Sequence, residues 1–269
     1  MRPLIGTSWK MNLVPSEATA WFAIARPLLE PLTAERDLFV LPPFPALAAA
    51  RESLAGSAIA YGGQDVHGDD RGAHTGDVSA AMLDDLGCRY AEIGHSERRH
   101  DHGETDRIVA AKVRAALRWG LVPIVCVGER APGDSKEAVA IVTAQLEAGF
   151  AGLGATDLDR LVVAYEPVWA IGEGAAAAAP THVAALHEAI AGWLTERGAT
   201  TARVLYGGSV DERTAPGLLA TPGVDGLFVG RAALDPRRFA AIAAAPLPGH
   251  RRDQPSDEDD RPPTRQRSA

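Results

Sequence analysis

The sequence predicts a single α/β domain that closes into a (β/α)8 barrel, and three observations lead to this fold class. Eight short apolar segments alternate strictly with eight longer amphipathic segments within residues 1–245. No linker rich in proline, glycine or serine divides this alternation into two domains. The number of repeats and the chain length are typical of a closed barrel, whereas an open doubly wound sheet is the main alternative.

The expected strands are short apolar runs without alternation, as in parallel sheets that are covered on both faces. They are Leu4–Thr7, Leu38–Leu41, Ala58–Gly62, Tyr90–Ile93, Val122–Val127, Leu161–Ala164, Val204–Tyr206 and Gly226–Val229. The expected helices are Ser16–Leu29, Ala46–Leu54, Ser79–Leu86, Glu104–Trp119, Ser135–Phe150, Thr181–Arg197, Glu212–Leu219 and Pro236–Ala245. Ser79 and Thr181 are suitable N-caps, and Gly87 and Gly120 follow helix ends, which supports these boundaries.

Residues 246–269 differ from the barrel in composition, because they are polar, charged and rich in proline, with almost nothing to bury. We expect a disordered C-terminal tail there.

Cys88 and Cys126, the only cysteines, lie in or beside apolar runs, which favours buried reduced thiols over a disulfide or a metal site.

The charge balance limits the classes of partner. The formal net charge is −8, and the basic run at Arg98 and Arg99 is too short to follow a phosphate backbone, so no nucleic-acid partner is expected. The N-terminus has no signal-peptide core and no apolar run approaches membrane-spanning length, so we expect no membrane partner and a cytoplasmic protein.

The loops after the strands would form the active site of such a barrel. Lys10 follows the first strand, where it would point a cation into the barrel mouth in a chain with only three lysines. His95 follows the fourth strand at the start of a short helical turn, where the helix dipole disfavours imidazolium. A neutral ring there can donate a hydrogen bond to a carbonyl. The histidines expected to be solvent-exposed instead are His100, His102, His182, His187 and His250.

The segment from Ala164 to Gly174 follows the sixth strand and begins with a carboxylate, Glu166. Pro167 and Trp169 would stiffen it, and the glycines at its end would let it hinge. We therefore expect a flap that closes beside an acid, an arrangement suited to proton abstraction in a dry pocket.

The seventh and eighth strands end in Gly207-Gly208-Ser209 and in Gly230-Arg231. Glycines allow backbone N–H groups to approach an anion, and these two loops form the usual phosphate site of a barrel. The run from Gly172 to Ala177 has the spacing of a dinucleotide-binding fingerprint, but it stands too far from the strand end to form one. We expect no nicotinamide or other cofactor.

Five segments together resemble the triosephosphate isomerase family, whose fold is the TIM barrel. They are Ser-Trp-Lys-Met-Asn at 8–12, Gly-His-Ser-Glu-Arg-Arg at 94–99, Ala-Tyr-Glu-Pro-Val-Trp-Ala-Ile-Gly at 164–172, Tyr-Gly-Gly-Ser-Val at 206–210 and Val-Asp-Gly-Leu-Phe-Val-Gly at 224–230. The resemblance covers residues 1–245 in order, and the second and third segments are highly specific.

The resemblance implies interconversion of glyceraldehyde 3-phosphate and dihydroxyacetone phosphate without metal or cofactor. Glu166 would be the base, His95 the neutral electrophile and Lys10 the cation beside the substrate. The substrate-binding residues would be Ser8, Trp9, Lys10, Glu97, Gly172, Ser209, Gly230 and Arg231. It also implies a homodimer in which Thr75 reaches toward the partner's site.

The chain departs from the family pattern, which usually has asparagine at Ser8 and Asp65, Thr-Gly-Lys at Glu173-Gly174-Ala175, and a second glycine at Arg231. The chain is poor in asparagine and lysine, which accounts for Ser8, Asp65 and Ala175 but not for Arg231. Two other functions stay open: isomerisation of a four-carbon ketose phosphate such as L-erythrulose 1-phosphate, and sugar-phosphate binding without catalysis.

Overall fold

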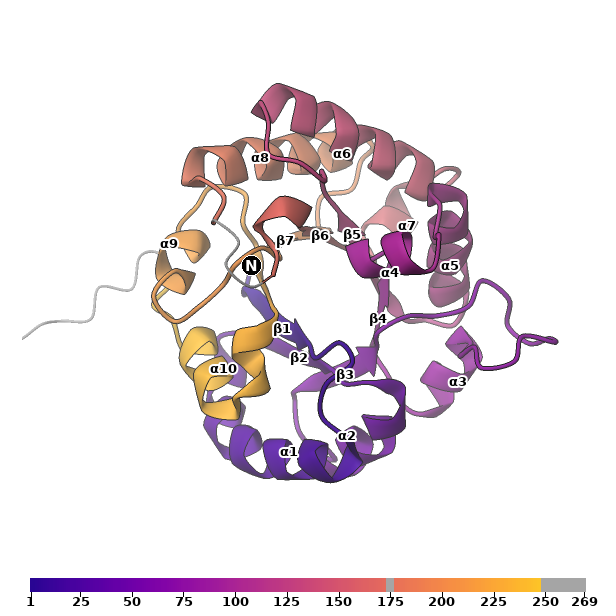
Figure 1. Cartoon of the computed structure of the whole chain (residues 1–269), viewed down its shortest axis with the longest axis vertical. Coiled ribbons are helices and arrows are strands. Elements are labelled where there is room, and N and C mark those ends of the chain that lie inside the picture. Colours follow the sequence, from indigo (N-terminus) through magenta and orange to yellow (C-terminus); the bar gives the residue numbers. More distant parts are fainter. Residues whose placement is uncertain (173–176, 248–269) are drawn as a thin grey trace, which may run out of the picture.

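The computed structural model describes residues 1–172 and 177–247, and within these ranges the chain forms a closed parallel barrel with the strand order β1 to β8. Figure 1 looks into the ring of strands, with the helices arranged around its outside. β1 pairs with both β2 and β8, so the sheet has no free edge. The closed (β/α)8 barrel is therefore confirmed and the open doubly wound sheet is excluded.

All eight strands lie within two residues of the expected positions. They are β1 Leu4–Ser8, β2 Asp37–Leu41, β3 Ala60–Gly63, β4 Tyr90–Ile93, β5 Val122–Val127, β6 Val162–Tyr165, β7 Arg203–Tyr206 and β8 Gly226–Val229. The α-helices are α1 Pro15–Leu29, α2 Leu47–Ser53, α3 Ala80–Asp85, α4 Ser96–Asp101, α5 Asp106–Arg118, α6 Ser135–Gly149, α7 Ala155–Leu158, α8 Pro180–Glu196, α9 Ala215–Leu219 and α10 Pro236–Ala243. The short 3-10 helices are η1 Glu30–Ala34, η2 Phe44–Ala46, η3 Val168–Ala170 and η4 Arg231–Leu234.

Two apolar layers hold the barrel together. The larger lies between the strands and the surrounding helices, and a smaller cluster from several strands fills the barrel itself. In that cluster the Phe39 ring lies 4.9 Å from Tyr90 and 5.6 Å from Phe228, centroid to centroid. Gly6 makes room for this packing, because a Cβ there would lie 2.1 Å from the Phe39 ring. The filled interior closes the barrel below the strand ends, so a ligand can enter only at its mouth.

The helix expected at 212–219 begins later than predicted, at Ala215. The Asp211 carboxylate accepts the backbone N–H groups of Arg213 and Thr214, at 3.0 and 2.7 Å, and this side-chain turn occupies the expected first turn.

Two histidines expected at the surface are buried, so that prediction was wrong for His182 and His187. Both lie on the face of α8 that packs against the barrel. His182 Nε2 lies 3.1 Å from the Tyr165 hydroxyl, and His187 Nδ1 donates to the Gly223 carbonyl at 3.0 Å. Burial lowers the pKa of His187 to about 4. His100 and His102 are exposed as expected, and His250 lies outside the described residues.

Both cysteines are buried free thiols, as expected. In the described ranges no helix is long and apolar enough to cross a membrane. Leu247 packs against the core, two residues beyond the expected domain boundary, and the rest of the expected tail lies outside the described residues.

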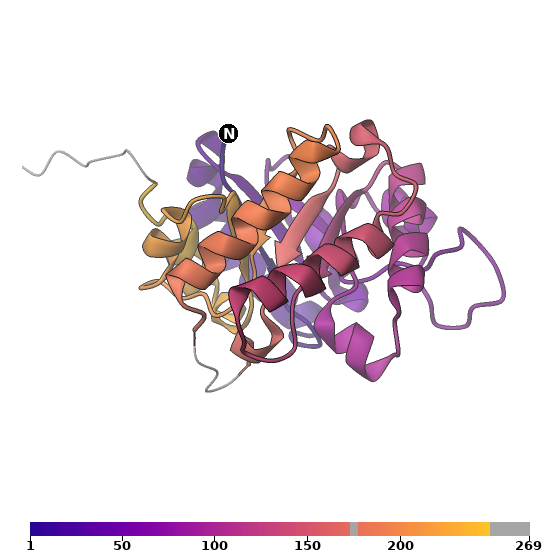
Figure 2. The same ribbon diagram turned by 90° about the horizontal axis from the view of Figure 1, so that it is seen from above.

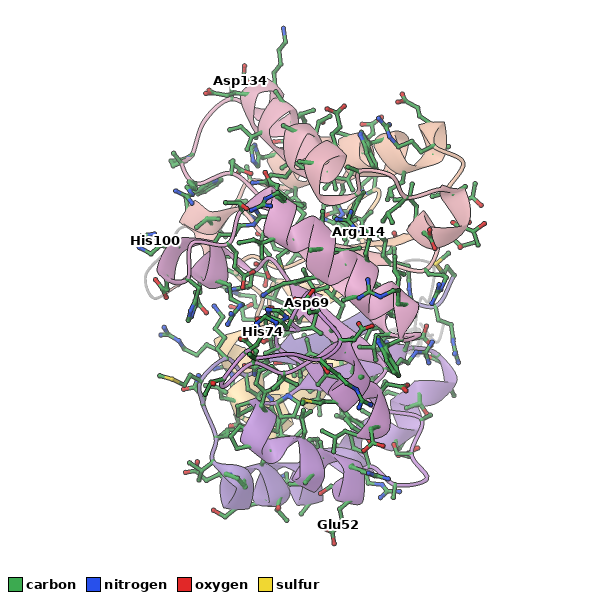
Figure 3. The ribbon with its side chains drawn as sticks, turned by 90° about the vertical axis from the view of Figure 1, so that its right-hand side faces the viewer. Glu52, Asp69, His74, His100, Arg114 and Asp134 are labelled. Carbon is green, nitrogen blue, oxygen red and sulfur yellow. The ribbon has the colours of Figure 1, made fainter. Side chains whose placement is uncertain are left out.

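The connection between β3 and α3 projects from the side of the barrel (Figures 1 and 2). Thr75 is exposed on this segment. Figure 3 views the molecule from that side, with Asp69 and His74 of the same segment toward the viewer.

Candidate active site

A pocket of about 910 Å³ opens at the carboxyl ends of the strands and gathers nearly all the residues singled out in the sequence. Its lining includes Ser8, Trp9, Lys10, His95, Glu97, Glu166, Gly172, Ser209, Gly230 and Arg231. Thr75 is not part of this lining, because it stands on the projecting segment. Trp9 is 1% exposed, and its indole packs 4.8 Å from Trp21, so the ring supports the wall from behind.

His95 is held as a neutral ring with a defined tautomer. It is the N-cap of α4, and its Nδ1 accepts the backbone N–H of Glu97 at 3.2 Å. The proton of the neutral ring is therefore on Nε2, which faces the carboxylate of Glu166. Burial, and then the charge of Lys10, lower the pKa of His95 to about 4. The ring can donate a hydrogen bond from Nε2 while remaining uncharged.

Lys10 places its ammonium group beside that ring. Its backbone is left-handed, with φ of 53°, and its carbonyl accepts a hydrogen bond from Gln64 at 3.0 Å. The ammonium group pairs with Glu97 Oε1 at 2.6 Å. Non-glycine residues in this conformation are strained and are retained where neighbouring bonds hold them, as Gln64 does here.

Glu166 is 5% exposed and lies directly after β6, whose register fixes its backbone: its N–H donates to the Val127 carbonyl at 2.8 Å. Its Oε2 has no hydrogen-bond partner among the described residues and lies 3.4 Å from His95 Nε2. Burial raises the pKa of Glu166, and the nearby carboxyl of Glu92 raises it further. A carboxylate in this environment is a stronger base than one in water.

The segment after Glu166 is anchored at its start. Trp169 Nε1 donates to the buried carboxylate of Glu129 at 2.6 Å, and the Ser209 hydroxyl donates to the Ala170 carbonyl at 2.9 Å. Gly172 has φ of 110°, a conformation that L side chains rarely adopt. The family departure expected at Glu173-Gly174-Ala175 lies outside the described residues.

The expected phosphate end of the pocket is formed by the loops after β7 and β8. Gly207 passes so close to Glu166 that a Cβ there would lie 2.7 Å from Glu166 Cγ. Gly230 has open space around it, and exposed Arg231 stands at the pocket mouth. Backbone N–H groups of such glycine loops are suited to an anion.

Sequence reasoning missed Glu92, a buried carboxyl of β4 that lines the pocket. The available signal was an acidic residue inside the apolar run Tyr90–Ile93, where a charged group is costly unless it has a function.

Asp65, noted as a departure from the family pattern, does not line the pocket. It accepts two hydrogen bonds from the buried ammonium group of Lys112, at 2.6 and 2.8 Å, and also pairs with Arg98. Lys112 binds Glu104 as well, at 2.5 Å. These residues form a buried ion network behind the site.

Among residues 1–172 and 177–247, two groups of side chains could offer three metal ligands each. In the first group, Glu92 and Glu166 line the pocket and Cys126 lies next to them. Burial raises the pKa of all three side chains, so a cation would have to displace protons.

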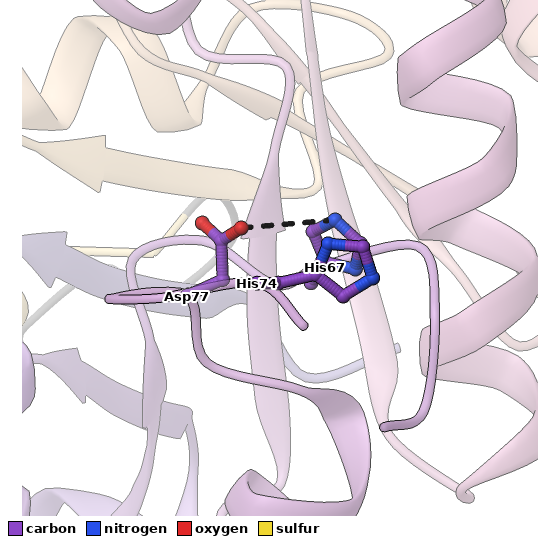
Figure 4. A group of neighbouring side chains, drawn as sticks. All are labelled: His67, His74 and Asp77. Carbon is purple, nitrogen blue, oxygen red and sulfur yellow. Dashed lines mark ion pairs between the residues drawn. The ribbon is translucent and has the colours of Figure 1, made fainter. Parts of the chain in front are cut away.

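The second group is His67, His74 and Asp77, on the projecting segment (Figure 4). The two imidazoles stack with centroids 4.0 Å apart, and His67 Nε2 lies 3.7 Å from Asp77. Neither histidine lines the pocket, so this group is separate from the site.

Comparison with known proteins agrees with this geometry. The family model described as Triosephosphate isomerase matches residues 3–246. The chain is 48% identical over 246 residues to the triosephosphate isomerase of Thermus thermophilus, covering 90% of this chain and 97% of the relative. It is 45% identical over 260 residues to that of Mycobacterium tuberculosis, covering 92% and 99%. A crystal structure of the enzyme from Bartonella henselae superposes with a TM-score of 0.76 at 35% identity, covering 90% of this chain and 98% of that one. Barrel, pocket and relatives lead to one conclusion: this chain belongs to the triosephosphate isomerase family.

Proposed function

We propose that this protein interconverts dihydroxyacetone phosphate and glyceraldehyde 3-phosphate by moving a proton between adjacent carbons. The observation that carries the proposal is the pairing of an unbonded, buried carboxylate oxygen of Glu166 with the protonated Nε2 of neutral His95, 3.4 Å away. A base and a hydrogen-bond donor on the same pocket wall are what proton abstraction beside a carbonyl requires.

Each residue then has a defined role. Glu166 removes the proton from C1 of the ketose, and the C–H electrons form the enediolate double bond as the carbonyl oxygen gains negative charge. His95 donates a hydrogen bond to that oxygen, and the ammonium group of Lys10 stabilises the developing charge. The hydroxyl proton on the C1 oxygen moves to the C2 oxygen, and Glu166 returns the abstracted proton to C2, so that C1 becomes the aldehyde and C2 carries the hydroxyl group of the aldose. Backbone N–H groups around Ser209 and Gly230 hold the phosphate.

The direct test is Glu166→Gln, which keeps the size of the side chain but cannot accept the proton. We expect kcat to fall about a thousandfold with little change in KM, because the base acts on the transition state. The matched control is Glu147→Gln, an exposed position on α6 that should retain full activity. Turnover of the Glu166 variant within about tenfold of wild type would remove this residue from the mechanism.

A four-carbon ketose phosphate is the second candidate substrate, and the short side chain of Ser8 on the pocket floor, with Arg231 at the mouth, favours it. If these residues set the preference, Ser8→Asn with Arg231→Gly should shift kcat/KM toward the triose by about 1–3 kcal/mol. If the ratio of kcat/KM for glyceraldehyde 3-phosphate to kcat/KM for erythrulose 1-phosphate is unchanged in the double variant, the four-carbon substrate is eliminated. Binding of either substrate without turnover would instead support a non-catalytic sugar-phosphate protein.

We propose that residues 1–245 form the catalytic domain and that the protein is a cytoplasmic homodimer. The exposed projecting segment with Thr75, and Met82 beside it at 54% exposure, support a dimer interface on this side of the barrel. Two buried free thiols suit a reducing compartment.

A further inference from the structure

The pocket floor contains a carboxyl to which the proposed reaction assigns no role. Glu92 is 2% exposed, its Oε2 lies 2.7 Å from the Ser8 hydroxyl oxygen, and its Oε1 lies 3.9 Å from Cys126 Sγ. Ligand atoms of Glu92, Cys126 and Glu166 all lie within 4.8 Å of one another. A second buried carboxyl therefore stands beside the base.

Two carboxyl groups this close in a dry pocket cannot both be ionised without strong repulsion. The charged and titratable groups that face Glu92 are Lys10 after β1, Asp65 after β3, Glu97 on α4, Cys126 on β5 and Glu166 after β6. Lys10 is paired with Glu97, and Asp65 with Lys112, so neither pair neutralises the two buried carboxyls. The two carboxyls are therefore expected to share one proton near neutral pH.

The location of that proton follows from the chemistry. Glu166 must be ionised to act as a base, so in the active form the proton is on Glu92. Burial raises the pKa of Glu92 to about 7, which places its titration in the physiological range. Such titrations belong to the pair of carboxyls and not to one of them alone.

The protonation state of Glu92 decides what Ser8 can offer a substrate. A hydroxyl has one hydrogen, and an ionised Glu92 accepts it, which leaves only a lone pair of Ser8 toward the pocket. A protonated Glu92 can instead donate to Ser8 Oγ at the same 2.7 Å, and the hydroxyl hydrogen becomes free. Ser8 lines the pocket, so it can then donate to a ligand.

We propose that protonated Glu92 is a positioning residue that turns the Ser8 hydroxyl into a hydrogen-bond donor for the reacting oxygen of the sugar phosphate. The inference rests on the proposed isomerase function and deepens it. In the ionised state the same residue withdraws the donor and adds a negative charge beside Glu166. Activity should therefore require one carboxyl protonated and the other ionised.

The experiment is the pH profile of kcat/KM for glyceraldehyde 3-phosphate with wild type and Glu92→Gln. Wild type should give a bell-shaped profile whose alkaline limb begins near pH 7, where Glu92 loses its proton. The glutamine amide can donate to Ser8 but cannot ionise, so the variant should lack that limb. Its kcat/KM should exceed that of wild type by roughly tenfold or more at about pH 9. Glu52→Gln, an exposed position on α2, is the control for loss of one charge and should keep the wild-type profile.

Two further variants test the connection to Ser8. Near pH 6, Ser8→Ala and Glu92→Leu should each lower kcat/KM by roughly tenfold to a hundredfold, and the double variant should lose no more than either. Glu92→Gln should restore most of the loss seen with leucine. Additive losses would overturn the proposal, because they would show that the two side chains act independently.

Isotope-edited infrared spectroscopy provides a readout that does not depend on activity. The difference between wild type and Glu92→Gln should contain the C=O band of a protonated carboxyl at pH 6, and this band should disappear above pH 7 to 8. Absence of the band, or an alkaline limb that persists in Glu92→Gln, overturns the role of Glu92 while leaving the isomerase function intact. A wild-type protein without isomerase activity would remove both.

Discussion

Gly207→Ala should misplace the base while leaving the fold intact. The Cβ added at this position would lie 2.7 Å from Glu166 Cγ and 2.9 Å from its Oε1. Ordinary contact between carbon atoms begins near 3.5 Å, so the Glu166 side chain must retreat by about 1 Å. The residue is 5% exposed and has little room to move elsewhere. A displacement of this size at a reacting group can cost about a hundredfold in rate, and we expect kcat to fall by about that factor.

Steady-state kinetics on the triose phosphates, together with chemical denaturation, would separate displacement of the base from loss of stability. KM should change little, and the free energy of unfolding should fall by no more than about 1–3 kcal/mol, the usual cost of one extra methyl group in a packed site. Gly192→Ala is the matched control: this glycine is exposed within α8 and a Cβ there meets nothing within 4 Å. It should keep kcat and gain roughly 0.5–1 kcal/mol of stability. A Gly207→Ala enzyme with kcat within twofold of wild type would refute this placement of the base.

Two further variants test the buried ion network and the proposed dimer. Lys112→Met would leave Arg98 to balance the carboxylates of both Asp65 and Glu104, and should lower the free energy of unfolding by up to about 3–5 kcal/mol near pH 8. The loss should be smaller near pH 5, because burial already raises the pKa of Asp65 and its protonation removes one charge. Chemical denaturation at both pH values measures the free energy of unfolding, with Lys136→Met at an exposed position as the control. Equal losses of stability at the two pH values would contradict the prediction. Thr75→Arg should weaken dimerisation and activity together, and sedimentation showing an intact, fully active dimer would disprove the proposed interface, with Thr19→Arg on α1 as control.

The strands and the pocket position could be predicted from the sequence because both follow from local patterns. Each apolar run predicted one strand, and in a barrel the loops that follow the strand ends meet at the same mouth. Lys10, His95 and Glu166 were therefore placed in one pocket, although 156 positions separate the first from the last.

The errors arose where the environment comes from distant parts of the chain. His187 is polar, and only the packing of α8 against the barrel shows that it is fully buried. The turn at Asp211 delays α9 through side-chain hydrogen bonds that helical periodicity does not reveal. Glu92 was overlooked because its partners, Ser8 and Cys126, come from two other strands.

The pairing of β1 with β8 has a consequence for the growing chain on the ribosome. One edge of β1 finds its partner only when residues 226–229 have been synthesised, 218 positions after Ser8. At about 5–20 residues per second, that edge stays unpaired for roughly ten to forty seconds. Gly230, at the proposed phosphate end, directly follows the closing strand. The nascent polypeptide therefore has no complete substrate site until its last strand has emerged, and in that interval its first strand is open to pairing with other chains.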